Sequence, residues 1–291
     1  MLEHLDLLAA DGSLWEGGGV DPDGRPGQVL GFRGIIACEL FVETMSRDAH
    51  SGGAHILPSA AWRLLRALAS LKDENERILI PGFYDRVLPP SQADLDLIAQ
   101  QPDFEEHYRQ TFGIRQFVNN RSGQELLTSV FEPTCNIQGI TTGWQGPGTK
   151  TIVPAQASAK LDFRLVPDQN PEEILELLRK HLDAQGFEDV RIKAHGMMWP
   201  FKASEDDPLV RLTHAAAEEV YGMAPKPPVP LGGGSSPAYA FSGPLGNIPV
   251  VHAGVGYPHA NGHAPDENIR IADFLNGARH IARLLNGFAD L

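Results

Sequence analysis

The stretch ASAKLDFRLVPDQNPEEILELLRKHLDAQGFEDVRIKA, residues 157–194, carries the strongest secondary-structure signals of the chain. Its first part, residues 157–166, alternates between apolar and polar side chains, a pattern typical of a strand with one buried face. Asn170 is followed by a proline and two glutamates, which predicts a helix that begins there and runs to about Ala184. Residues 190–194 predict another strand.

The preceding part of the chain carries the same kinds of signal. Residues 35–45 are rich in β-branched and apolar side chains and predict a strand. Pro58 predicts the start of a helix that extends to about Leu71. Residues 74–130 are polar and irregular, with short helical patterns such as residues 93–100. The order strand, helix, strand, helix, strand predicts a sheet with helices on one face.

The last third of the chain starts a new pattern. We expect a helix from Asp207 to about Gly222, a short helix over residues 235–241, and a short buried strand over residues 248–252. A terminal helix follows, with apolar residues that recur at helical spacing and predict its buried face. These residues are Ile271, Phe274, Leu275, Ala278, Ile281, Ala282 and Leu285.

These patterns divide the chain near Arg33 and Gly196. Residues 34–195 are expected to form one domain, inserted between residues 1–33 and residues 196–291, which would pack together as part of a second domain. The expected fold class is α/β, with an α+β inserted domain.

Composition limits the classes of partner. The formal net charge is −13 and the pI is about 5.2, so nucleic acid and anionic membrane are not expected as partners. The two cysteines, Cys38 and Cys135, lie far apart and form no metal or redox motif, which favours a reducing compartment. Neither a signal peptide nor an apolar run long enough to cross a bilayer is found, so a cytoplasmic location is expected.

Short motifs in a fixed order add a family resemblance. They are Asp11-Gly12-Ser13-Leu14-Trp15, Phe32-Arg33-Gly34, Asp48-Ala49-His50-Ser51-Gly52-Gly53, Gly233-Gly234-Ser235 and Gly262-His263-Ala264-Pro265-Asp266-Glu267-Asn268. The chain resembles the co-catalytic zinc peptidases of metallopeptidase family twenty, which include carnosine dipeptidase, aminoacylase and carboxypeptidase G. The most specific part runs from Pro133 to Pro167 and is similar to the dipeptidase branch of that family.

The resemblance implies a particular architecture. The inserted domain of the family is a four-stranded antiparallel sheet with two helices, which serves as a lid and as the surface of a homodimer. The flanking domain is an α/β domain that holds two divalent metal ions, zinc or else manganese or cobalt. The lid would therefore sit inside the C-terminal part of a catalytic domain.

The resemblance also implies two metal ligands. Asp11 matches the terminal carboxylate of one metal ion, and His263 matches the terminal imidazole of the other. The residue types suit this chemistry, because imidazole and carboxylate are common ligands of zinc. From the residues alone, Asp11 is equally an Asx-turn aspartate before Gly12, and His263 a solvated loop histidine.

Three lid residues match catalytic or substrate-binding positions. His50 matches a histidine that reaches the active site of the partner subunit and stabilises the oxyanion, although it also fits an ordinary turn at a strand end. Thr151 resembles a lid hydroxyl that acts across the dimer. Arg164 lies on a predicted strand, and its planar fork suits the grip of a substrate carboxylate, with an ordinary ion pair as the alternative.

Further substrate contacts are expected outside the lid. The turn formed by Gly233, Gly234 and Ser235 resembles a backbone-exposing turn that binds the same carboxylate. Gly232 replaces a glutamate that dipeptidases often carry before this turn, which weakens the case for recognition of a free amine. His195 is either a further polar contact or a buried histidine at the hinge.

Several family residues have no match. The family's front segment holds a His-x-Asp motif, a bridging aspartate and a Glu-Glu pair, and no such series precedes Asp11. We therefore expect an incomplete metal-dependent peptidase or amidohydrolase that binds metal weakly and is inactive alone. Its substrates would be short peptides or N-acyl amino acids. The alternatives are a non-catalytic dimerisation or binding module, and a mononuclear hydrolase that uses Asp11, His259 and His263.

Overall fold

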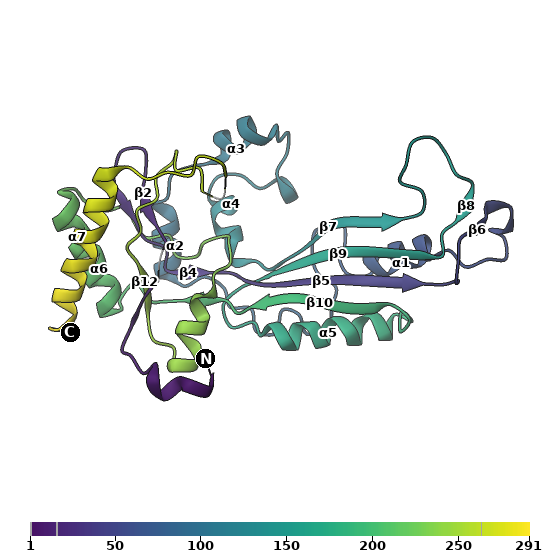
Figure 1. Cartoon of the computed structure of the whole chain (residues 1–291), viewed down its shortest axis with the longest axis horizontal. Coiled ribbons are helices and arrows are strands. Elements are labelled where there is room, and N and C mark those ends of the chain that lie inside the picture. Colours follow the sequence, from purple (N-terminus) through teal and green to yellow (C-terminus); the bar gives the residue numbers. More distant parts are fainter. Residues whose placement is uncertain (1, 16, 263) are drawn as a thin grey trace.

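The computed structural model describes residues 2–15, 17–262 and 264–291. An elongated antiparallel sheet extends from a second, more irregular part that carries both ends of the chain (Figure 1).

The sheet has the strand order β10-β5-β9-β7. Its strands are β5 (Gly34–Glu43), β7 (Thr134–Thr142), β9 (Gln156–Leu165) and β10 (Arg191–Met198). All neighbouring pairs are antiparallel. Strands β5 and β9 are paired along their whole length, from Gly34 opposite Leu165 to Glu43 opposite Gln156. This confirms the antiparallel sheet that the family resemblance implied.

Two helices, α1 (Ala60–Ala69) and α5 (Pro171–Ala184), cover one face of this sheet. The alternation in β5 and β9 puts apolar side chains such as Leu40, Leu161 and Phe163 into this layer, where all three are fully buried. The opposite face is less buried and carries charged side chains such as Glu39, Lys160 and Arg164.

The sequence signals for α5 are confirmed in detail. The Asn170 side chain accepts hydrogen bonds from the backbone N–H groups of Glu172 and Glu173, so it caps the helix. Pro171 occupies the first helical turn. The chain leaves the helix through Gly186, whose φ of +76° favours glycine.

An insertion of short helices lies in the sequence between α1 and β7. It contains α2 (Gln92–Ala99), α3 (Glu105–Phe112), α4 (Gln124–Thr128), η3 (Val118–Asn120) and η4 (Ser129–Phe131). A small apolar cluster of Ile98, Phe131 and Leu231 joins this insertion to the irregular part of the molecule.

A short arm extends from the end of the sheet that is remote from the chain termini (Figure 1). It consists of β6 (Ala49–His50), η2 (Ser51–Gly53) and β8 (Ile152–Val153). Strand β6 pairs with β8, with His50 opposite Ile152. The Asp48 carboxylate holds the arm in place by accepting a hydrogen bond from the backbone N–H of Ala155 at 2.9 Å.

The flanking segments form the second part. Its elements are η1 (Leu2–Leu7), β1 (Ser13–Trp15), β2 (Gly19–Val20), β3 (Pro26–Gly27), β4 (Gly31–Phe32), β11 (Phe201–Lys202), α6 (Pro208–Tyr221), η5 (Pro237–Phe241), η6 (Gly243–Leu245), β12 (Val250–His252) and α7 (Ile271–Phe288). Strands β1 and β12 pair in parallel, and β4 pairs with β11. A strand near the start of the chain thus pairs with one from its last third.

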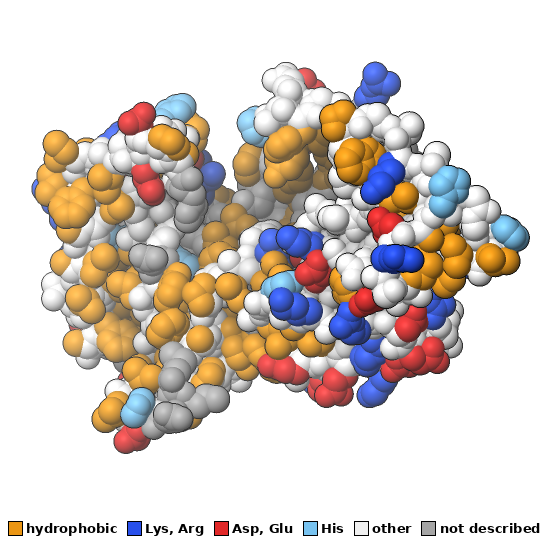
Figure 2. All heavy atoms as spheres, turned by 45° about the vertical axis from the view of Figure 1, so that its right-hand side comes forward, with side chains coloured by type: hydrophobic (Ala, Val, Ile, Leu, Met, Phe, Trp, Pro, Cys, Tyr) orange, Lys and Arg blue, Asp and Glu red, His pale blue; other side chains and the backbone are white. Residues whose placement is uncertain are grey.

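The predicted buried face of α7 is wrong. Ile271, Phe274 and Leu285 are 80%, 59% and 63% exposed. The helix instead buries its other side, where His280 donates to the Thr213 carbonyl of α6, Gly277 approaches Val255 after β12, and Leu284 is buried. In Figure 2 hydrophobic side chains gather over the part of the surface where α7 lies in Figure 1.

Strand β10 also runs beyond the expected domain boundary, since it continues through Gly196 to Met198. No helix in the described part of the chain is long and apolar enough to cross a membrane.

Candidate functional site

Arg164 and Ser235 meet where the sheet joins the flanking segments. Arg164 lies near the end of β9, and its Nη1 donates a hydrogen bond of 2.7 Å to Ser235 Oγ. The two residues are 71 positions apart in the sequence, and the fold brings them together. A guanidinium and a hydroxyl in contact, both partly exposed, form a suitable grip for a carboxylate.

The turn before Ser235 is anchored to the start of the sheet. The backbone N–H of Arg33 donates to the Gly234 carbonyl at 3.0 Å, and that of Gly232 donates to the Gly31 carbonyl at 2.8 Å. Gly233 and Gly234 are exposed, and a Cβ added to either would meet no described atom within 4 Å. A ligand can therefore approach this backbone closely.

A buried carboxylate sits behind Arg164. Asp162 is 7% exposed and accepts hydrogen bonds from Asn136 Nδ2 at 2.9 Å and Gln138 Nε2 at 3.1 Å. Arg164 Nε lies 3.8 Å from Asp162 Oδ1. Asp162 thus holds the inner side of the guanidinium, while the outer side faces Ser235.

His195 lies on the same open face of the sheet, on β10. Its Nε2 is 3.4 Å from Glu39 Oε2, and its side chain is 39% exposed. The pKa of Glu39 is held below its usual value by a hydrogen bond from Ser158 and, to a smaller extent, by His195. The alternative of a buried hinge histidine is therefore wrong, and His195 remains a proposed substrate contact.

His50 and Thr151 lie together on the arm. The Ser51 N–H donates to the Thr151 carbonyl at 3.0 Å, and both His50 and Thr151 are exposed. His50 Nδ1 accepts a hydrogen bond of 3.0 Å from the Gly52 N–H. A neutral imidazole that accepts through Nδ1 carries its proton on Nε2, so an N–H donor is available to a second molecule.

The arm and the Arg164–Ser235 pair lie at opposite ends of the sheet. Arg164 pairs with Ile35 at one end of β5, whereas the arm follows Glu43 at the other end. A ten-residue strand such as β5 is about 30 Å long at ~3.4 Å per residue. Within one chain, His50 cannot contact a ligand held by Arg164.

Only one of the two predicted metal ligands lies among the residues that the structure describes. Asp11 is exposed and precedes β1, whereas His263 lies outside the described residues. Among the residues that the structure describes, no three His, Cys, Asp or Glu side chains come together as a metal site. His259 is exposed and holds its loop through its carbonyl, which accepts from Asn268 Nδ2 at 3.2 Å. The described residues therefore do not fit a metal centre on their own.

Sequence reasoning missed two buried polar residues. His252 is 4% exposed at the end of β12 and contacts the Phe32 ring edge-on at 5.2 Å. Arg33 is 8% exposed, and burial together with the neighbouring Arg164 lowers its pKa to about 10. His252 ends an apolar stretch, and Arg33 stands in the Phe32-Arg33-Gly34 motif. Neither context predicts that the polar side chain is buried.

Comparison with solved structures finds a close overall match. The M20 family metallo-carboxypeptidase Sso-CP2 from Sulfolobus solfataricus superposes with a TM-score of 0.91 at 36% sequence identity. The match covers 100% of this chain and 66% of that protein.

Curated relatives are dipeptidases. The Beta-Ala-His dipeptidase of Homo sapiens is 26% identical over 99% of this chain and 56% of its own length. The Cys-Gly metallodipeptidase DUG1 of Saccharomyces cerevisiae is 25% identical over 98% of this chain and 59% of its own length. The chain thus spans about half the length of the curated relatives that it matches.

The family profile of the M20 peptidase dimerisation domain matches residues 30–190. These residues hold three of the four strands of the sheet, β5, β7 and β9, and the two helices that cover it, while β10 follows directly after them. The match takes in more than half of the 291 residues. The chain therefore belongs to the M20 peptidase dimerisation-domain family.

Proposed function

We propose that this chain supplies the dimerisation domain and the substrate-carboxylate site of a metal-dependent peptidase or amidohydrolase. Its substrate would be a dipeptide or short peptide with a free C-terminal carboxylate. The contact between Arg164 and Ser235 is the observation that carries this proposal. Relatives named as dipeptidases and a structural neighbour named as a carboxypeptidase support the reaction class.

Each part of the chain has its own role in this proposal. Residues 34–195 act as lid and dimerisation domain, while residues 1–33 and 196–291 form part of the catalytic domain. A carboxylate at the junction accepts hydrogen bonds from the Arg164 fork and from N–H groups of the open turn before Ser235. Asp162 keeps the guanidinium oriented toward that turn.

The far end of the sheet acts on a second copy of the chain. Because the arm lies about 30 Å from the carboxylate site, His50 and Thr151 would serve the site of the partner. There the His50 Nε2–H would donate to the oxygen on which negative charge develops, a contribution that is commonly worth about 3 kcal/mol.

The free edge of β7 is the proposed line of contact between the copies. Strand β7 contains no charged residue, whereas β10, the other edge, carries Arg191 and Lys193. Charged side chains protect an edge from pairing. On β7, Ile137 and Ile140 are 46% and 42% exposed on the side that α1 covers. This edge offers both unpaired backbone groups and apolar side chains to a two-fold partner.

Metal ions belong to the reaction class, and they supply polarisation of the scissile carbonyl when bound. Asp11 and His263 are the proposed ligands in this chain. Two terminal ligands without a bridging carboxylate give an incomplete centre, so this chain alone is proposed to bind zinc, manganese or cobalt weakly.

Calorimetric titration with the dipeptide Ala-Leu and with its C-terminal amide tests the carboxylate site without requiring turnover. The acid should bind at least about tenfold more tightly than the amide, because only the acid engages the Arg164 fork. Arg164→Lys keeps the charge but loses the fork, and should remove most of this difference. Arg191→Lys, on the exposed edge of β10, is the matched control and should leave it unchanged.

Equal affinity of the acid and the amide for the unmodified chain would overturn the carboxylate role. The chain would then be better described as a dimerisation or binding module without a substrate grip.

A further inference from the structure

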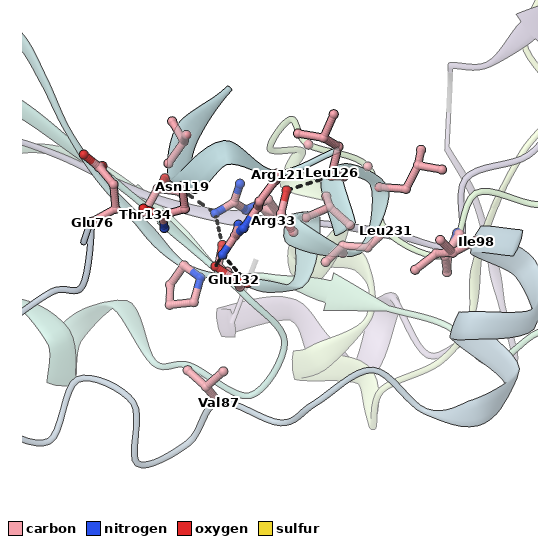
Figure 3. Close-up of a pocket in the computed structure, with 18 of the residues that line it drawn as sticks. Arg33, Glu76, Val87, Ile98, Asn119, Arg121, Leu126, Glu132, Thr134 and Leu231 are labelled. Carbon is pink, nitrogen blue, oxygen red and sulfur yellow. Dashed lines mark hydrogen bonds and ion pairs between the residues drawn. The ribbon is translucent and has the colours of Figure 1, made fainter. Parts of the chain in front are cut away.

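A large cavity lies where the insertion of short helices meets the start of β7 and the turn before Ser235. Its volume is about 1010 Å³, the size of a small-molecule site. Figure 3 shows polar side chains, including Asn119 and Thr134, toward one end, with Arg33 near the middle. Leu231 and Ile98 lie toward the other end. The cavity is therefore amphipathic.

Arg33 is the unusual residue of this cavity. Its Nη2 donates to the Glu132 carbonyl at 2.6 Å and to the Arg164 carbonyl at 3.4 Å, while its Nε is buried without a hydrogen-bond partner in the described part of the chain. None of the described carboxylates forms an ion pair with it. A buried guanidinium without a carboxylate is costly, and burial accordingly lowers the pKa of Arg33 to about 10.

The two acidic residues of the cavity lining form ion pairs with bases other than Arg33. Glu132 is paired with Arg121 at 2.7 Å, and Glu76 is paired with Lys72. The remaining basic residue of the lining, Arg77, lies over the Tyr84 ring at 4.4 Å. Both acidic residues of the lining thus already form ion pairs, so the lining keeps a surplus of positive charge. The chain as a whole carries a net charge of −13.

The apolar end is built from side chains of three separate segments. Ile98 of α2 and Leu231 are each 2% exposed, and Leu126 of α4 is half-buried beside them. Because this wall offers few polar partners, it suits the hydrocarbon part of a ligand.

We propose that this cavity binds a monocarboxylate with an apolar tail, with the carboxylate at Arg33 and the tail against Ile98, Leu126 and Leu231. The cavity adjoins the proposed substrate grip, since Gly233 of the turn before Ser235 lines it, although neither Arg164 nor Ser235 does. The proposal does not rest on the peptidase function, because Arg33 and the apolar wall carry it.

Calorimetric titration of the full chain with phenylbutyrate, and with phenylbutanol as its uncharged counterpart, tests this site. Phenylbutyrate should bind at least about tenfold more tightly than the alcohol, since an arginine–carboxylate contact distinguishes them. Arg33→Met should abolish this preference. Leu126→Asp, which leaves Arg33 and its backbone contacts in place, should weaken phenylbutyrate binding by about tenfold or more.

Leu95→Asp makes the same chemical change on the exposed side of α2, outside the cavity lining, and should leave binding unchanged. Equal binding of the acid and the alcohol would overturn the proposal. So would loss of phenylbutyrate binding in Arg164→Lys with retention in Leu126→Asp, because the acid would then occupy the substrate grip instead.

Discussion

The two ends of the central sheet differ in how much of a site they assemble by themselves. At the end beside the flanking segments, Arg164 and Ser235 meet within one chain at 2.7 Å. At the other end, His50 and Thr151 are held firmly on the arm but are exposed, with only local backbone contacts. Their exposure supports the proposal that His50 and Thr151 act on a second copy of the chain.

The two edges of the sheet show the same contrast. Strand β10 carries Arg191 and Lys193 near its start and contacts α5, although it ends in two exposed methionines, whereas β7 is uncharged and exposes two isoleucines. The account therefore predicts that the second copy approaches along β7 and not along β10.

The largest effect is expected when a charge is introduced at the edge formed by β7. Ile137→Lys places a charge in the proposed interface, which costs about 2 kcal/mol per copy, and a two-fold interface carries the change twice. The dimer dissociation constant should rise by about a thousandfold. Sedimentation velocity at increasing protein concentration measures it.

Met197→Lys is the matched control, since Met197 lies on β10 and is 40% exposed. It should leave the dimer intact. If Met197→Lys dissociates the dimer and Ile137→Lys does not, the assignment of the two edges is reversed.

A smaller effect is expected on stability when the N-terminal caps of two helices, one in the sheet domain and one in the flanking part, are removed. Asn170 caps α5 and Asp207 caps α6, and both helices begin with proline. Asn170→Ala and Asp207→Ala should each lower the free energy of unfolding by about 1 kcal/mol. Chemical denaturation followed by circular dichroism measures both changes. Asp206→Ala, at an exposed neighbour, should change stability by less than about 0.5 kcal/mol, and a comparable loss there would discount the capping role.

The smallest effect is a pH dependence of stability, to which one histidine of the sheet domain and one of the flanking part contribute. Burial lowers the pKa of His181 on α5 and of His280 on α7 from the ordinary value of 6.5. The unfolded chain therefore binds protons more readily than the folded chain, and stability is lost as pH falls below about 6.5. Melting temperatures measured from neutral to mildly acidic pH should decline less steeply in His280→Gln. An unchanged slope would show that His280 does not contribute.

Much of the fold is predictable from the sequence because local signals agree with packing. Alternation fixes the buried face of β9, and the Asn170 cap and Gly186 fix both ends of α5. The face of α7 is not predictable in this way. Its apolar stripe predicts burial, but close packing on α6 selects the side with Gly277 and His280.

The candidate site is predictable only in part. The chemistry of Arg164 and Ser235 suits a carboxylate, yet their contact depends on the fold. His195 left two alternatives open; its exposed position beside Glu39 excludes the buried one, and the substrate contact stays a prediction. The burial of Arg33 and His252 was not predictable, although Arg33 belongs to the Phe32-Arg33-Gly34 motif, because burial of a polar side chain is a property of the three-dimensional structure.

Cross-linking between two singly substituted chains tests the central claim most directly, namely that the arm of one copy serves the carboxylate site of the other. The native Cys38 and Cys135 are buried, and burial raises the pKa of each thiol to about 12, so introduced thiols react selectively. An equal mixture of His50→Cys and Ser235→Cys chains, treated with a short bismaleimide, should give a covalent dimer. Neither chain alone should give it in comparable yield. Absence of the covalent dimer from the mixture, or an intrachain link in a chain that carries both substitutions, would contradict the account.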